Sequence, residues 1–264
     1  MGQFENPREK QIPRADKVAH YFPPRLSENL RRRFFVERFE NNAAVMSGDA
    51  AHHLGRVLRA ERGQLYELSD GKAAWLGRIE SVSRDRVQFA LVEPIAGREP
   101  ALQTTLLLAV VKFDSFEWAL EKGTELGVRT IVPLAAARSE KVLLHAAEKR
   151  SERWRKILLE AAQQSRRVSL PELKAIDKPE NAFRQAEGFK VMLSERAEAP
   201  QLKDIVPGRA QRAVLAIGPE GGWTDEEFAA AEKAGFQQAS LGQLILRTET
   251  AVVSALSNLN YALG

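Results

Sequence analysis

The chain has 264 residues, and its 39 lysines and arginines against 35 acidic residues give a formal net charge of +4. A hydrophobic content of 44% and a charged content of 28% exclude disorder of the whole chain and suit one large domain or two small ones. The absence of cysteine excludes disulfides, thiol catalysis and cysteine metal sites, and with only four histidines we expect no metal. Because no apolar run is long enough to cross a membrane and no secretory signal is visible, we expect a cytoplasmic protein without a membrane partner.

The first third of the chain divides into an extension and a region of short strands. Residues 1–30 are polar, contain four prolines and lack a sustained period, so we interpret them as an N-terminal extension. Residues 31–99 contain short apolar runs separated by turn signals, of which Asp70-Gly71 is a strong hairpin signal. They predict a small β-barrel or sandwich, interrupted by one helix from a cap at Asp49 to a stop at Gly63.

Residues 100–264 alternate buried strands with amphipathic helices, which is typical of a parallel α/β domain. The predicted strands cover residues 104–111, 130–133, 190–193 and 213–217, followed by a short strand that ends at Leu241. Helices are predicted over residues 115–126 and 149–166.

Basic side chains gather in two places. Residues 31–62 hold seven arginines against four acids, and residues 149–167 hold seven lysines or arginines against Glu152 and Glu160. Such runs indicate either a nucleic-acid partner or, more commonly, a solvated helix face.

The most informative stretch follows the strand at 213–217 and contains the five residues from Gly218 to Gly222. Thr224 and Glu227 have the spacing of a capping box, which predicts that a helix begins there. Glycines let a backbone approach a ligand closely, so the stretch predicts either a ligand site or simply a tight strand-to-helix turn. It matches neither a phosphate loop nor a dinucleotide fingerprint, and the carboxylate of Glu220 disfavours a phosphate.

A second polar cluster, Arg247-Thr248-Glu249-Thr250, precedes the last predicted helix. Helix capping by Thr248 or Thr250, with Arg247 paired to Glu249, explains this cluster as well as a functional role does.

Five blocks along the chain carry a family resemblance. They are Lys112 with Glu117-Trp118, residues 122–128, residues 160–165, residues 218–222 and residues 245–251. In this order they resemble the RsmE family, the SPOUT-class methyltransferases that methylate N3 of one uridine in small-subunit (16S) ribosomal RNA. The likeness covers residue 32 to the end and makes residues 1–30 an addition.

The resemblance implies a fold and partners. Residues 31–99 would form a PUA-like RNA-binding β-barrel, and residues 100–264 a SPOUT methyltransferase domain whose mainly parallel sheet is tied into a trefoil knot. It also implies S-adenosyl-L-methionine (SAM) as the methyl donor and a homodimer with the sites at the subunit interface.

The resemblance further implies site residues. SAM would bind to backbone groups of three loops, comprising Leu193, Ser194, Gly218, Pro219, Glu220, Gly221, Gly222, Leu241, Gly242, Ile245, Leu246 and Thr248. For the RNA we expect contacts from Arg31, Arg32, Arg33, His52, His53, Arg56, Arg59, Arg166 and Arg167. Adjacent helical residues point about 100° apart, so we expect His52 to be exposed and His53 partly buried. We expect Ile245 to belong to strand core, a position that is also compatible with an adenine contact.

The chemistry requires alignment and charge stabilisation and no metal, because the donor carries its methyl group on a sulfonium. Uracil N3 holds a proton at neutral pH, and we expect Arg247 to stabilise the anion left after its removal. Glu249, if its pKa is raised by burial, or Glu220 would accept the proton. N3 lies on the pairing edge, so the uridine must be single-stranded or splayed out.

Two departures from the family pattern affect RNA-side charge. Ser165-Arg166-Arg167 stands where the family usually has Ser-Gly-Arg, and Leu244 stands where an arginine is common. The rival interpretations are a SPOUT methyltransferase acting on another RNA and a catalytically silent RNA-binding or ribosome-assembly factor.

Overall fold

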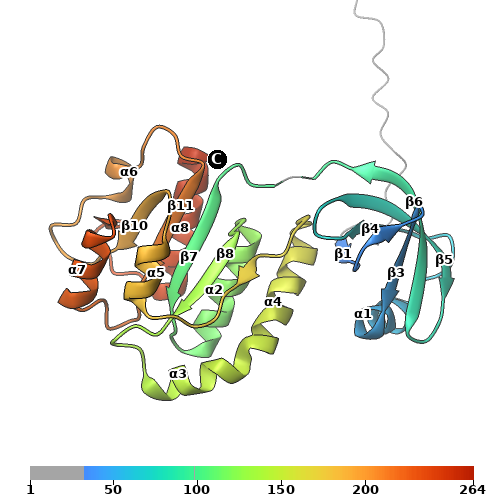
Figure 1. Cartoon of the computed structure of the whole chain (residues 1–264), viewed down its shortest axis with the longest axis horizontal. Coiled ribbons are helices and arrows are strands. Elements are labelled where there is room, and N and C mark those ends of the chain that lie inside the picture. Colours follow the sequence, from blue (N-terminus) through green and yellow to red (C-terminus); the bar gives the residue numbers. More distant parts are fainter. Residues whose placement is uncertain (1–32, 98) are drawn as a thin grey trace, which may run out of the picture.

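The computed structural model describes residues 33–97 and 99–264, which form two lobes joined by a linker, each built on a six-stranded sheet (Figure 1). The N-terminal lobe contains β1 to β6, and the C-terminal lobe contains everything from β7 onward. The predicted extension and the predicted RNA contacts Arg31 and Arg32 lie outside the described residues. Among the helices of the two described ranges, none has both the length and the apolar character that crossing a membrane requires.

The N-terminal sheet has the strand order β1-β4-β5-β6-β3-β2. Its strands are β1 (Arg33–Phe35), β2 (Phe39–Glu40), β3 (Ala43–Ser47), β4 (Leu65–Ser69), β5 (Ala74–Val82) and β6 (Arg86–Ile95). β1 and β4 pair in parallel, and the other pairs are antiparallel. Buried and exposed residues alternate along the first half of β6, because one face of the sheet covers a core that includes Tyr66 and Phe89. Within residues 33–97 all strands belong to one curved sheet, so the sandwich alternative, which requires two sheets, is wrong (Figure 1).

The predicted hairpin at Asp70-Gly71 is confirmed between β4 and β5. Asp70 Oδ1 accepts the backbone N–H groups of Lys72 and Ala73, at 3.0 and 2.9 Å. Gly71 has a φ of +86°, a conformation that glycine adopts without strain.

The helix predicted from Asp49 to Gly63 is shorter and less regular than expected. Helix α1 (Gly48–His52) passes directly into a π-helical turn, η2 (His53–Val57), and no side chain caps α1. Ala51 and Leu54 are buried, whereas His52 and His53 are both exposed. The expected partial burial of His53 is therefore wrong, because α-helical periodicity does not continue through a π-helical turn.

The C-terminal sheet has the order β12-β10-β11-β7-β8-β9, and all of its pairings are parallel, as predicted. Its strands are β7 (Gln103–Ala109), β8 (Thr130–Leu134), β9 (Glu172–Leu173), β10 (Phe189–Leu193), β11 (Arg212–Ile217) and β12 (Gln237–Ala239). Burial is nearly continuous along β7 and β11, as expected of strands covered on both faces. β12 ends two residues before the predicted end at Leu241.

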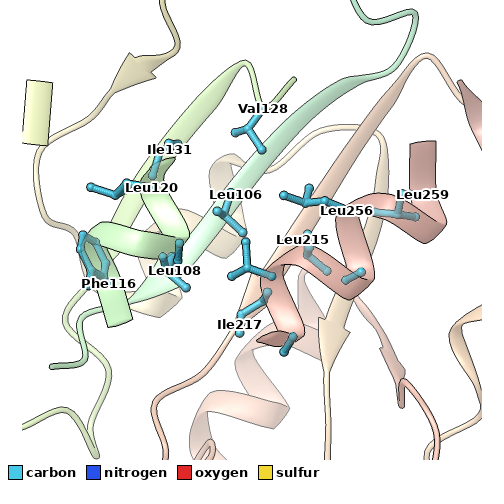
Figure 2. Close-up of a cluster of buried hydrophobic side chains, with 14 of the residues drawn as sticks. Leu106, Leu108, Phe116, Leu120, Val128, Ile131, Leu215, Ile217, Leu256 and Leu259 are labelled. Carbon is cyan, nitrogen blue, oxygen red and sulfur yellow. The ribbon is translucent and has the colours of Figure 1, made fainter. Parts of the chain in front are cut away.

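Helices cover both faces of this sheet. One face carries α2 (Phe113–Glu125), α4 (Ser151–Gln164) and α8 (Thr248–Leu263), and the other carries α5 (Pro179–Gln185) and α7 (Asp225–Lys233). Figure 2 shows Leu120 of α2 and Leu256 of α8 beside Leu106 of β7 and Leu215 of β11. The connecting elements are α3 (Lys141–Ala147), η3 (Glu148–Arg150) and α6 (Leu202–Ile205). This apolar core holds the carboxyl ends of the strands in fixed positions.

The two lobes meet where α4 ends. Ser69 Oγ of β4 donates a buried hydrogen bond of 2.6 Å to the carbonyl oxygen of Val168. Arg166 lies 3.6 Å from Glu67 of β4 and has a φ of +55°. A left-handed conformation costs an L residue about 1–2 kcal/mol. Glycine, which the resemblance leads us to expect at this position, adopts the same conformation without that cost.

Candidate functional site

The three loops predicted to hold the methyl donor lie side by side at one edge of the C-terminal sheet. β12, β10 and β11 are adjacent and parallel, so their carboxyl ends meet there. Leu193 ends β10 and Ser194 follows it, Gly218–Gly222 follow β11, and Leu241–Leu246 follow β12. Segments distant in the sequence therefore come together in space.

The glycine-rich segment forms a tight turn. The Gly222 N–H donates to the carbonyl oxygen of Pro219 at 2.8 Å, and Gly222 has a φ of +70° that favours glycine. Gly218 is required for a different reason, because a Cβ at this position would lie 3.0 Å from the Trp223 ring. The backbone N–H groups of Glu220 and Gly221 donate to no acceptor within the described part of the chain. The turn thus presents two free donors.

A capping box starts α7 directly after the turn, as predicted. Thr224 Oγ1 accepts the Glu227 N–H at 3.2 Å, and Glu227 Oε2 accepts the Thr224 N–H at 2.8 Å. Glu227 Oε1 accepts a third N–H, that of Ala137 in the loop after β8, at 2.8 Å. The side chain of Glu227 is buried, with 2% exposure, and its carboxylate is satisfied by backbone groups of two segments.

The loop after β10 is attached to the same turn. Trp223 Nε1 donates to the carbonyl oxygen of Leu193 at 3.1 Å, and the Trp223 ring packs edge-on against Phe183. Ser194 is buried, and its N–H donates to the carbonyl oxygen of Ala239 at 2.9 Å. These contacts fix the positions of Leu193 and Ser194 relative to the glycine turn.

Arg247 and Thr248 connect the last helix to the glycine turn. Thr248 Oγ1 donates to the carbonyl oxygen of Gly218 at 3.3 Å, and no side chain caps α8. Arg247 is the N-cap residue, and its exposed side chain forms no ion pair or hydrogen bond with the described residues. The expected threonine cap and the expected pairing of Arg247 with Glu249 are therefore wrong, although Glu249 does lie in the first turn of α8, where its charge favours the helix. The exposed Arg247 thus directly precedes a residue that is bonded to the turn.

Two carboxylates lie close to this edge of the sheet. Glu220 is exposed within the glycine turn, and Glu249 is partly buried in the first turn of α8.

Within residues 33–97 and 99–264, no three histidine or acidic side chains converge as a metal site would require.

The loop Leu241–Leu246 differs from the other two loops. None of its backbone groups forms a hydrogen bond with another backbone group of the described residues. Leu244 is 82% exposed and Ile245 is 78% exposed. The expectation that Ile245 belongs to strand core is wrong, because β12 ends at Ala239 and the chain leaves the sheet before reaching it.

Four of the predicted RNA contacts form an exposed group on the N-terminal lobe. They lie on α1, on η2 and just after it: His52, His53, Arg56 and Arg59. They are available to a partner.

Arg33 is not available. It is 4% exposed, and its Nε and Nη2 donate to Glu67 Oε2 at 3.2 and 3.1 Å. Its predicted RNA contact is corrected to a structural role, because its guanidinium joins β1 to β4 inside the lobe.

Arg167 is likewise structural. It is 6% exposed, and its Nη1 donates to the carbonyl oxygens of Thr124 and Val128, at 3.0 and 2.7 Å. Burial lowers the pKa of this guanidinium. Its predicted RNA contact is therefore also corrected. Arg166, beside it, keeps a half-exposed side chain.

Sequence reasoning missed Trp223 and Arg138. Trp223 fills the space over Gly218, and Arg138 Nη1 donates to the carbonyl oxygen of Gly221 at 2.7 Å. The glycines directly before Trp223 could have indicated the contact between the Trp223 ring and Gly218, since a bulky ring needs small neighbours. Nothing in the sequence indicated the second contact, which joins residues 83 positions apart.

Comparisons with known proteins agree with this geometry. A family model described as an RNA methyltransferase domain matches residues 98–260. The ribosomal RNA small subunit methyltransferase E of Mesomycoplasma hyopneumoniae is 31% identical over 226 residues, covering 85% of this chain and 97% of that protein. The Synechocystis protein of the same name is 34% identical over 216 residues, covering 79% of this chain and 70% of that protein.

Solved structures show the same fold. A methyltransferase from Legionella pneumophila, in complex with SAM, superposes with a TM-score of 0.81 at 32% identity, covering 88% of this chain and 98% of that one. The ribosomal RNA small subunit methyltransferase E of Neisseria gonorrhoeae, bound to SAM, gives a TM-score of 0.81 at 30% identity and the same coverage. The chain therefore belongs to the ribosomal RNA small subunit methyltransferase E family, the RsmE family that its sequence blocks resemble.

Proposed function

We propose that this protein uses SAM to methylate N3 of a specific uridine in 16S ribosomal RNA of the small subunit. One observation carries the proposal within this family. The exposed Arg247 directly precedes Thr248, which is hydrogen-bonded to the preformed glycine turn.

The three loops suit SAM as their ligand. The free N–H groups of Glu220 and Gly221 and the unpaired backbone of Leu241–Leu246 offer hydrogen bonds to its amino, carboxylate and hydroxyl groups. The relatives from Legionella pneumophila and Neisseria gonorrhoeae were solved with SAM bound. When bound, SAM supplies a methyl group on a sulfonium, ready for in-line transfer. We assign the binding of SAM to the same loop residues that the sequence predicted for it.

Arg247 and a carboxylate would perform the proton chemistry. The guanidinium N–H groups of Arg247 would donate to a uracil carbonyl oxygen, where negative charge develops as N3 loses its proton. We assign Glu249 as the acceptor of that proton, because it is partly buried and two residues from Arg247. Glu220, which is solvent-exposed, is the second candidate.

The N-terminal lobe would present the RNA. We propose that its curved sheet is a PUA-like barrel and that His52, His53, Arg56 and Arg59 contact the RNA backbone together with Arg166. Arg31 and Arg32, which lie outside the described residues, stay predictions of the same kind. The target uridine must be unpaired, because N3 lies on its pairing edge.

A knotted, dimeric enzyme is the assembly we propose. Large apolar side chains are exposed on the loop after β12 at Leu244 and Ile245, on α2 at Trp118 and on α8 at Tyr261. A second copy covering them would complete the donor site from across the interface. We retain the division into residues 31–99 and a trefoil-knot domain at 100–264, and we place the protein in the cytoplasm, where ribosomal subunits assemble.

The test uses purified protein and small subunits from a strain that lacks the gene. We expect calorimetry to show SAM binding, and methyl label to enter 16S RNA at one uridine where primer extension then stops. Donor binding without any label would indicate a silent RNA-binding factor. Label in another RNA would indicate a different SPOUT target.

A further inference from the structure

Arg138 reaches the glycine turn from the loop that follows a different strand, β8. It lies in the loop between β8 and α3, and its Nη1 donates to the carbonyl oxygen of Gly221 at 2.7 Å. Its side-chain stem lies along the turn, since a Cβ on Gly221 would be 3.4 Å from Arg138 Cβ and 3.5 Å from Arg138 Cδ. The guanidinium holds the carbonyl from the solvent side, because both Arg138 and Gly221 are exposed.

The residues on both sides of Arg138 are anchored independently. The Ala137 N–H donates to Glu227 Oε1 at 2.8 Å, and Ser139 Oγ donates to the carbonyl oxygen of Val110 at 2.8 Å. Glu227 and Ser139 are buried, so water competes little for these bonds. The backbone that carries Arg138 is thus fixed to the end of β7 and to the start of α7.

We propose that Arg138 is a positioning residue for the methyl-donor turn, an inference that rests on the proposed function. Two consecutive glycines make the turn conformationally free, and a ligand that orders such a segment loses affinity in doing so. By holding the Gly221 carbonyl, Arg138 keeps the N–H groups of Glu220 and Gly221 turned outward before the donor arrives. Arginine suits this role because its planar guanidinium makes directional hydrogen bonds.

Arg138→Gln is the variant that tests this role, and Arg209→Gln is its matched control. Arg209 is an exposed arginine that precedes β11, so it lies at the opposite end of the strand that leads into the turn. Both variants remove one positive charge. We expect calorimetry to give SAM a Kd about five-fold higher in Arg138→Gln, the size of one net hydrogen bond, and an unchanged Kd in Arg209→Gln. Arg138→Lys should fall between wild type and Arg138→Gln.

A kinetic split separates positioning from direct contact. At saturating SAM we expect the kcat of Arg138→Gln to stay within about two-fold of wild type, because the donor itself then orders the turn. The KM for RNA should not change. An unchanged donor Kd would overturn the proposal, as would a defect confined to the KM for RNA, which would make Arg138 an RNA contact.

The rate of hydrogen exchange at the Gly222 amide measures directly how well the turn is ordered, because this amide donates to the Pro219 carbonyl oxygen within the turn. Without donor it should exchange faster in Arg138→Gln than in wild type. Equal exchange rates would show that Arg138 does not order the turn. This measurement requires neither SAM nor methyl transfer. If the wild-type protein bound no SAM, the proposed function would be wrong, but hydrogen exchange would still show whether Arg138 orders the turn.

Discussion

Two loops at the same edge of the C-terminal sheet are built in opposite ways. The turn Gly218–Gly222 is held from three directions, by Arg138, by Thr248 and by the ring of Trp223 over Gly218. The loop Leu241–Leu246 forms no backbone hydrogen bond with the rest of the described backbone and exposes two large apolar side chains.

The turn at 218–222 is therefore a preformed surface, whereas the loop at 241–246 needs a ligand or a second subunit to become ordered. A turn tied by several hydrogen bonds presents its free N–H groups in place and loses little entropy when it binds. A loop with exposed leucine and isoleucine gains stability only when something covers it. We expect the first loop to set the affinity for the donor and the second to close over it.

Replacing Arg247, which directly follows the second loop, should have the largest effect. Arg247→Ala removes the donor to the developing uracil anion, so we expect kcat to fall by at least about 100-fold. SAM affinity measured by calorimetry should stay within a few-fold. Arg155→Ala is the control, because Arg155 is exposed on α4, where it pairs with Glu152 of the same helix. Normal turnover in Arg247→Ala would remove Arg247 from the mechanism.

Gly218→Ala should disrupt the preformed turn. The new Cβ would lie 3.0 Å from a Trp223 ring that cannot easily move, because its Nε1 is bonded to Leu193. We expect a loss of about 1–3 kcal/mol in unfolding free energy, measured in urea, and SAM binding at least about ten-fold weaker. Gly208→Ala, where a Cβ would meet open space, is the matched control. Wild-type donor affinity in Gly218→Ala would mean that the turn does not hold the donor.

Thr224→Ala should weaken the same turn from its far side. Loss of the bond between Thr224 Oγ1 and the Glu227 N–H removes half of the capping box. We expect about 1 kcal/mol lower unfolding free energy. Thr250→Ala serves as the comparison, because Thr250 is exposed in a helix that no side chain caps. Equal losses in both variants would indicate that the box contributes nothing.

Ile245→Ser should have the smallest effect on stability. The side chain is already exposed, so the unfolding free energy should change by less than about 0.5 kcal/mol. SAM affinity should nevertheless fall about three-fold, because burying an isoleucine against a ligand or second subunit stabilises a closed loop. Ile217→Ser, in the buried strand β11, should instead destabilise the fold severely. No change in donor affinity in Ile245→Ser would separate this loop from the donor site.

The long buried strands and the capping box were predictable because their signals are local, whereas the short strand β9 was not predicted. Continuous apolar runs predicted β7 and β11, and the spacing of Thr224 and Glu227 predicted the start of α7. The helix after Asp49 was predicted less well, since a change to π-helical geometry leaves no clear mark in the sequence. Side-chain burial was hardest to predict, and His53 and Ile245 were both misplaced.

The sequence by itself determined the alternation of buried strands with helices in residues 100–264 and the family, because these depend on neighbouring residues and ordered motifs. Only the tertiary structure decided which arginines are free. Arg33 is engaged by Glu67, and Arg167 by carbonyl oxygens of Thr124 and Val128, partners that are 34 to 43 residues away. It also placed Arg138 against Gly221. Such pairs arise from the packing of distant segments, so no local pattern could indicate them.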